Sequence, residues 1–508
     1  MKMFTGVLKE QELSSFYNSA IKYNINQLNN LIAEYDAVSL FENWRLLIQS
    51  IDEFINIAYE LKNPINRLKY LSLNLDFTNR QNLVKLGELR SIIENTFDIE
   101  IWNRFKNMAI MLGSIDKTFQ DQKIWNDFGN EFNTSTVAKS ILYLQSRRLY
   151  YLAFLNLIPK VAKGKRKLDF INLLSDFQYY IDHFMVGVTS AHFGLILNHC
   201  YDDYELKSDG SVAKANYEFK HLDSFFLDPQ RLSLADQIEL RPEPLIVRQN
   251  LGKSTSKIFS FSEIANCMMQ FEDYFKKYKV ETLTEFNEIN LLLCDLAPSL
   301  INDFDFEISN TRFEEISSKY KSLCLFNNSQ EYFETLNSPA PFQRIENQYY
   351  STVVLLMRFV YRTIYSSLLK NRRFQVHSGF IFESRVSQIL NEKGYLNSGI
   401  TRINRKEFDV VTVKKDKIFN FQCKNNFVEI SDISQDYKKM SQLNSLLVNY
   451  YERSLLKEKS RELLLLEKLE KTEIEHFVVT RFPVISENPN IINFNNLNSW
   501  FTEADDEN

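Results

Sequence analysis

Glycine and proline are scarce in this 508-residue sequence, with 12 Gly and 10 Pro. Tight turns between β-strands rely on glycine, so this scarcity argues against a many-stranded sheet protein and favours helices. The composition is otherwise globular, with 44% hydrophobic and 25% charged residues. A chain of this length is too long for one hydrophobic core, which predicts about two to four domains.

Cysteine is also sparse, and the five cysteines are scattered along the chain without a CxxC pair. This pattern argues against both a disulfide framework and a structural zinc site. An excess of positive charge is lacking as well, because the net charge is −5 and the isoelectric point is about 5.9. Any contact with nucleic acid must therefore come from a local basic patch.

The sequence lacks a clear membrane or export signal. Its N-terminus, "MKMFTGVLKEQEL", has charges where a signal peptide needs an apolar core. The only span-length stretch without Asp, Glu, Lys or Arg is 183–201, but it holds three histidines and has acidic flanks. We expect a buried helix there, and a cytoplasmic protein without a membrane partner.

Two weaker signals do not support a ligand site. "NLGKST" resembles the end of a phosphate-binding loop, but Val247 stands where the first glycine of that loop belongs. His192, His199 and Cys200 lie in the charge-free stretch without a further ligand at a convincing spacing, so we interpret them as buried helix residues.

The residue pattern changes along the chain and predicts an α+β multidomain protein. Most of the sequence has apolar residues at three- and four-residue intervals, which is typical of helices. Near the C-terminus the expected order becomes helix, three strands, helices and strand. The predicted regions are a helical domain at 1–204, an irregular segment or insertion at 205–260, a helical continuation at 261–375, an α/β domain at 376–485 and a tail at 486–508.

The segment "EFDVVTVKKDKIFNFQCK", residues 407–424, reads as a β-hairpin with polar residues in its otherwise apolar half. Side chains alternate between the faces of a strand, and directly opposed residues lie about 5 Å apart. Antiparallel pairing around "KKDK" therefore brings four polar side chains together on one face. The predicted pairs are Val413 with Ile418, Asp409 with Gln422, and Glu407 with Lys424.

A helix before the hairpin supplies a further carboxylate. We expect this helix to begin at Ser378 and to end at Gly394. Glu383 lies three residues before Val386, on the side that should pack against the sheet. An ionised carboxylate there needs a partner, and Mg²⁺ or Mn²⁺ between this residue, Asp409 and Gln422 would provide one.

Glu383, Asp409 and the Gln422-Cys423-Lys424 triplet together resemble the PD-(D/E)xK nuclease superfamily, in its Mrr-like QxK variant. The resemblance covers 376–485 and implies a restriction-endonuclease-like core, αβββαβ with a mixed sheet. It also implies that Asp409, Gln422 and Glu383 hold the metal and that Lys424 is the catalytic lysine. Glu407 is either a further metal ligand or a partner of Lys424. Phe408 departs from the family, which commonly has Pro there.

The resemblance implies a metal-dependent endonuclease that hydrolyses phosphodiester bonds, with DNA as the expected substrate. A large helical region beside such a domain resembles restriction and anti-phage defence effectors, regulated through a protein partner or a homo-oligomer. Basic residues near the site are the expected nucleic-acid contacts. They are Arg402, Arg405, Lys406, Lys414 and Lys415, with Arg372 and Arg373 upstream.

Two alternatives stay open at this point. Because Gln422 is neutral, the domain is alternatively a degenerate nuclease fold that binds nucleic acid or acts as a scaffold without catalysis. The second alternative is a ribonuclease, since Arg372 and His377 have the Arg-x4-His spacing of HEPN ribonucleases. Apart from these, a purely structural interpretation has Lys424 and Glu407 as an edge ion pair and Asp409 as the cap of a turn.

Overall fold

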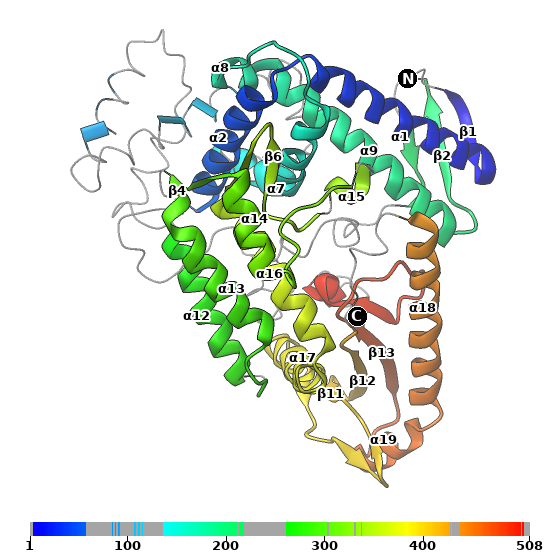
Figure 1. Ribbon diagram of the computed structural model, residues 1–508. Helices are drawn as coiled ribbons and strands as arrows, with labels where there is room; N and C mark the ends of the chain where they lie inside the picture. Colours follow the sequence, from blue (N-terminus) through cyan, green and yellow to red (C-terminus); the bar gives the residue numbers. More distant parts are fainter. Residues whose placement is uncertain are drawn as a thin grey trace.

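The protein is mixed α/β, with long helices and several small sheets in this computed structural model (Figure 1). Between 84 and 114 the structure describes only isolated positions. The other described ranges are 4–56, 136–210, 213–217, 261–277, 279–301, 304–329, 332–336, 338–426, 428, 436–498 and 500–501.

The N-terminal region is built from long helices packed in pairs, α1 against α9 and α2 against α7. Trp44 is fully buried between them, and its indole Nε1 donates to the backbone oxygen of Tyr151 at 2.7 Å. A three-stranded sheet, β1-β2-β3, closes one side. The elements are β1 (Thr5–Lys9), α1 (Glu10–Ala33), α2 (Ala37–Asn56), α7 (Thr136–Val161), α8 (Phe170–Asn172), the π-helix η2 (Leu173–Phe177), α9 (Gln178–Cys200), β2 (Glu205–Asp209) and β3 (Ala213–Ala215).

The charge-free stretch is part of α9, and the expectation of a buried helix is confirmed for His192 and most of the helix. It is wrong for the last turn, where His199 is exposed and Cys200 half-buried, because the helix end reaches the surface. Most of this helix is buried, and the ring of His192 packs against Phe333 at 4.9 Å between centroids. In the part of the chain that the structure describes, no helix combines the length and apolarity needed to cross a membrane.

Residues 261–375 are not helical throughout, because a four-stranded antiparallel sheet, β4-β5-β7-β6, lies among the helices. In β5, Phe306 and Ile308 are buried while their neighbours are not, a strand pattern too short to stand out in the sequence. The elements are α12 (Phe261–Lys277), α13 (Thr284–Leu296), the 3-10 helix η4 (Ala297–Ser299), β4 (Leu300–Ile301), β5 (Asp305–Ser309), α14 (Asn310–Lys319), α15 (Tyr332–Leu336), β6 (Gln343–Ile345), β7 (Gln348–Thr352) and α16 (Val353–Lys370).

The C-terminal region contains a five-stranded mixed sheet in the order β14-β13-β12-β11-β8. β8, β11 and β12 pair antiparallel, whereas β12, β13 and β14 pair parallel. The elements are α17 (Arg372–Glu392), β8 (Leu396–Asn397), β9 (Arg402–Ile403), β10 (Lys406–Glu407), β11 (Val410–Lys414), β12 (Lys417–Lys424), α18 (Tyr437–Lys459), α19 (Glu462–Leu469), β13 (Ile474–Thr480), β14 (Ile491–Asn493) and the 3-10 helix η6 (Phe494–Asn496).

Helix α17 begins earlier than expected. Asn371 is its N-cap and accepts a hydrogen bond from the backbone N–H of Phe374 at 3.1 Å, whereas Ser378 lies buried inside the helix. Gly394 follows its end with φ +81°, so the expected stop is confirmed. Helix α16 leads into α17 through Asn371 alone, which ties the helical region directly to the sheet domain.

Two layers of helices cover the two faces of this sheet (Figure 1). Phe382 and Val386 of α17 form one core with Val410, Phe421 and Cys423. On the other face, α18 packs on β12 and β13, and Leu465 of α19 lies with Val411 and Ile418. Phe408 is buried in this second cluster and not in the core that contains Val410, because the chain enters the ladder only at Val410.

The expected C-terminal tail is largely part of the domain. β14 extends the sheet, and Phe494, Leu497 and Phe501 are buried in the same core as Phe382. Residues 486–501 therefore belong with the α/β domain, and the boundary expected at 485 is too early. The asparagines of "NIINFNNLNSW" hide this in the sequence, since only pairing with β13 buries the apolar residues between them.

Candidate active site

The β11–β12 hairpin has the register that strand alternation predicts. Val413 lies opposite Ile418, and the two-residue turn Lys415–Asp416 has positive φ at both positions. Such a turn matches the twist of a hairpin. The register carries Asp409, just before β11, to the position opposite Gln422.

Asp409 and Gln422 are in direct contact. The side-chain Nε2 of Gln422 donates to Oδ2 of Asp409, and the backbone N–H of Cys423 donates to the same oxygen at 2.8 Å. Burial raises the pKa of Asp409, while these donors and the Lys424 ammonium oppose the rise. A carboxylate is thus held in a desolvated position by groups that favour its charge.

Glu383 is electrostatically coupled to this pair. Burial raises its pKa to about 7, the charges of Asp409 and Glu407 add to the rise, and Lys424 opposes it. The carboxylate extends from α17, which covers the apolar face of the sheet. The two carboxylates therefore come from different elements, α17 and the segment before β11, and influence each other through their charges.

Gln422 and Lys424 lie on the other face, toward α18. Lys424 Nζ is 5.2 Å from the ring centroid of Tyr450, a cation–π contact. Two residues before Gln422, Asn420 donates to Glu458 of α18 at 2.9 Å, and Glu458 is paired with Arg461. Polar contacts thus connect this strand face to α18.

The prediction that Glu407 faces Lys424 is wrong. Glu407 belongs to β10, which pairs with β9 in a separate hairpin and places it opposite Arg402. The two side chains are exposed and form an ion pair. The turn between β9 and β10, at Asn404 and Arg405, draws Glu407 away from the β11–β12 ladder.

Three of the expected nucleic-acid contacts, Lys414, Lys415 and Arg402, are distant from the site or engaged with other residues. Lys415, in the turn, lies six residues from Asp409, or about 20 Å along the strand. Lys414 is directed at the ring of Tyr395, 4.2 Å from its centroid. Arg402 is paired with Glu407, as described above. The remaining residues, Arg405 and Lys406 of the β9–β10 hairpin and Arg372 and Arg373 at the start of α17, are exposed, and Arg373 pairs with Glu281 at 3.4 Å.

The sequence did not indicate that three further residues lie near the site: Arg481, Asn425 and Ser378. Arg481 follows β13, and its backbone N–H donates to the Lys424 oxygen at 2.9 Å. Its Nη1 donates to Asn425 Oδ1 at 3.1 Å, and Asn425 donates to Ser378 at 2.9 Å. Because parallel strands end at the same edge of a sheet, an arginine directly after "HFVVT" was the available signal.

The donor set suits a hard cation. Carboxylate and amide oxygens from Glu383, Asp409 and Gln422 are the ligand types that Mg²⁺ prefers. The amide of Gln422 would have to rotate, because its amino group now points at Asp409. Among the described residues, no three His, Cys, Asp or Glu side chains gather as a metal site, so a cation here would also require the amide oxygen as a ligand.

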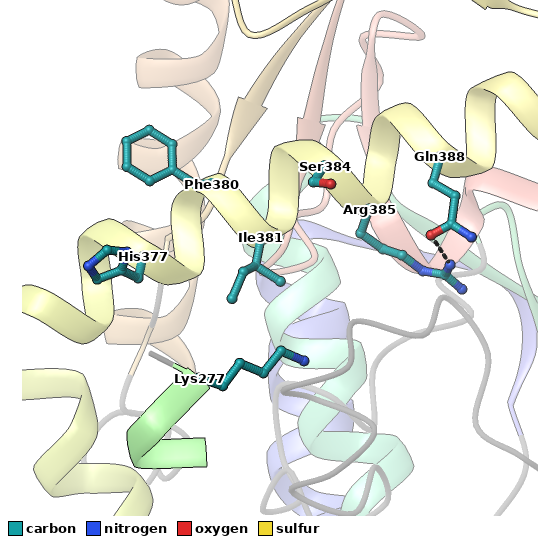
Figure 2. Close-up of a pocket in the computed structure, with 7 residues that line it drawn as sticks. All are labelled: Lys277, His377, Phe380, Ile381, Ser384, Arg385 and Gln388. Atoms are coloured by element: carbon teal, nitrogen blue, oxygen red, sulfur yellow. Dashed lines mark hydrogen bonds between the residues drawn. The ribbon is translucent and has the colours of Figure 1, made fainter. Parts of the chain in front are cut away.

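A separate cavity of about 490 Å³ lies on the outer face of α17 (Figure 2). The lining residues that belong to α17 recur at helical spacing on the side of the helix away from Val386, so this cavity is not part of the carboxylate site. Arg372 and His377 are about 140° apart around this helix and point in different directions, which does not support the ribonuclease pair. The lining consists of Lys277, His377, Phe380, Ile381, Ser384, Arg385 and Gln388.

The comparisons with known proteins give no relative. No protein-family model matches the chain, no curated protein matches it in sequence, and no solved structure matches its fold. The "NLGKST" segment lies outside the described residues. The function therefore has to be argued from the site.

Proposed function

We propose that this protein is a metal-dependent nuclease that acts in the cytoplasm and hydrolyses phosphodiester bonds of DNA, with 372–501 as a restriction-endonuclease-like core. The observation that carries the proposal is the Asp409–Gln422 contact, with Lys424 and Glu383 electrostatically coupled to it. The mixed sheet between α17 and α18 supports the same fold class. Carboxylates in ordinary surface ion pairs remain in water, whereas burial raises the pKa of both Glu383 and Asp409, as is common at functional sites.

Asp409, Glu383 and Gln422 would hold Mg²⁺ or Mn²⁺, which supplies positive charge to the phosphate and lowers the pKa of a water. Lys424 would orient that water or stabilise charge on the phosphorus oxygens. Tyr450 limits the positions that the Lys424 ammonium can take. Arg481, adjacent to Lys424 at the same sheet edge, is suited to contact a neighbouring phosphate.

The test is cleavage by the purified full-length chain, with Mg²⁺ or Mn²⁺, of plasmid DNA, single-stranded DNA and RNA. We expect DNA cleavage that is lost in Asp409→Ala and in Lys424→Ala, each checked for folding by circular dichroism. If no nucleic acid is cut with either metal, or if both variants cut like the wild type, the proposal is wrong.

One observation favours a second candidate, a nuclease fold that binds nucleic acid without cutting it. Gln422 and the Cys423 N–H already satisfy Asp409 Oδ2 without a metal. This candidate predicts binding that is unaffected by EDTA and no cleavage. The cleavage assay therefore distinguishes the two functions.

The helical region is proposed as the regulator of the nuclease, in the manner of a restriction or anti-phage defence effector. Its support is the direct passage from α16 to α17, the helix that carries Glu383. A protein partner or a second copy that moves α16 would thereby move this carboxylate. A protease site placed at Asn371, between α16 and α17, would test the coupling: DNA cleavage is compared before and after the chain is cut there.

A further inference from the structure

We propose that the exposed stripe of α18 is a track for a single strand of nucleic acid that leads to Lys424. This inference rests on the proposed nuclease function and names a substrate-binding surface for it. The stripe residues follow one another at intervals of seven, four, three and four, so they share one face of the helix. They are Lys439, Leu446, Tyr450, Arg453 and Lys457.

The stripe is exposed and positively charged. Lys439, Arg453 and Lys457 are all exposed, and Tyr450 retains 48% of its accessible surface. The two carboxylates of α18 lie elsewhere: Glu452 is half-buried, and Glu458 is 1% exposed and paired with Arg461. In a chain with net charge −5, this is a local cationic surface of the kind that phosphate contact requires.

The stripe is connected to the candidate active site. Tyr450 contacts Lys424 through its ring, while the next residue, Tyr451, about 100° further around α18, is fully buried. Helix α18 lies at the outer edge of the molecule, beside β13 (Figure 1). A strand bound along the stripe would therefore pass the Lys424 ammonium.

The dimensions suit a short strand. Lys439 and Lys457 are 18 residues apart, or about 27 Å along the helix. At about 3.4 Å per nucleotide this spans about eight nucleotides. The Tyr450 ring, between the cations, offers a surface on which a base can stack.

A second copy of the chain is the competing occupant, since Leu446 is 69% exposed and Leu456 is 67% exposed. A twofold contact would place the same patch on both sides. The cations of one stripe would then lie against the cations of the other, and like charges repel. Charge complementarity therefore favours the polyanion.

The test is fluorescence anisotropy with 5′-fluorescein single-stranded DNA of 4, 8 and 12 nucleotides, in EDTA so that nothing is cut. For Arg453→Ala/Lys457→Ala we expect about tenfold weaker binding near 0.15 M salt, because two phosphate contacts are lost. The slope of log affinity against log salt should fall by about 1.4. Affinity should rise up to about eight nucleotides and then level off.

The matched control is Lys22→Ala/Lys321→Ala, which removes the same charge from exposed positions on other elements. It should bind like the wild type. Tyr450→Ala should weaken binding several-fold while Tyr450→Phe, which keeps the ring, should not. All variants are checked by thermal unfolding.

Equal losses in the stripe variant and its control would overturn the track, as would unchanged binding by the stripe variant. A dimer that Leu446→Glu disrupts, with DNA binding intact, would assign the face to a second copy instead. If the wild type cuts DNA but the stripe variant binds it with unchanged affinity, only the proposal of the track is refuted. If binding depends on the stripe but no DNA is cut in Mg²⁺ or Mn²⁺, only the proposal of nuclease activity is refuted.

Discussion

Gln422 donates a hydrogen bond to Asp409 across the β11–β12 hairpin, at the position where a metal-binding carboxylate pair would otherwise face each other. A neutral amide makes this pairing favourable in the absence of metal, whereas a second carboxylate would repel Asp409. If the site binds a metal as proposed, this amide favours the metal-free structure at the expense of metal affinity.

Replacing Gln422 by Glu should make the domain more dependent on metal. In EDTA, Gln422→Glu should unfold at a lower temperature than the wild type, because two desolvated carboxylates would be adjacent. With about 5 mM Mg²⁺ it should gain more stability than the wild type gains, since charged ligands bind the cation more tightly. Thermal shifts with and without Mg²⁺ measure this. A Gln348→Glu control, at an exposed position of β7 in a separate sheet, should not show a larger gain. Equal Mg²⁺ responses of Gln422→Glu and wild type would contradict the metal assignment.

The raised pKa of Glu383, about 7 against an ordinary 4.5, predicts a pH-dependent stability. Between these values the folded state binds more protons than the unfolded state, so the free energy of unfolding falls as pH rises from about 5 to 7. Glu383→Gln removes this dependence. It should match the wild type at pH 5 and exceed it by about 1 kcal/mol at pH 8, a value reduced for partial solvent exposure.

Urea unfolding of both proteins in EDTA at pH 5 and pH 8 measures the difference. The same gap at both pH values would show that packing and not titration causes it. Adding Mg²⁺ at pH 8 should narrow the gap, because the cation then compensates the ionised Glu383.

Glu407 and Asp409 are two residues apart but should behave differently. Asp409→Asn should lower the cleavage rate at least about 100-fold, since it removes a charged metal ligand. Glu407→Gln should change the rate less than about threefold, because Glu407 is exposed and paired with Arg402 outside the hairpin ladder. Cleavage kinetics at saturating Mg²⁺ compare the two variants. A large loss in Glu407→Gln would return this residue to the metal site.

The C-terminal residues should be needed for folding. Phe494 is buried against Phe382 with ring centroids 5.3 Å apart, so Phe494→Ala should cost about 3 kcal/mol or more. Truncation after residue 485 should abolish cooperative unfolding of the α/β domain, since it removes β14 and the buried residues beyond it. Pro489→Ala, at an exposed position of the same segment, is the control and should change little. A stable chain ending at 485 would contradict the extended domain boundary.

The sequence by itself determined the local arrangement of the site. Strand alternation and a short turn set the hairpin register, so Asp409 meets Gln422 because a slip of one residue would turn Phe421 and Val410 out of the core. The stop at Gly394 and the buried helix α9 were equally local, since each depends on backbone preference or on side chains within one element.

Tertiary structure alone decided which elements meet. Glu407 continues the same strand pattern as Asp409, yet it pairs with Arg402, because the choice of strand partner depends on contacts distant in sequence. Contacts distant in sequence likewise place α17 on the apolar face, Arg481 beside Lys424 and β14 at the sheet edge. Periodicity within a segment reports which face is buried, but not which neighbour buries it.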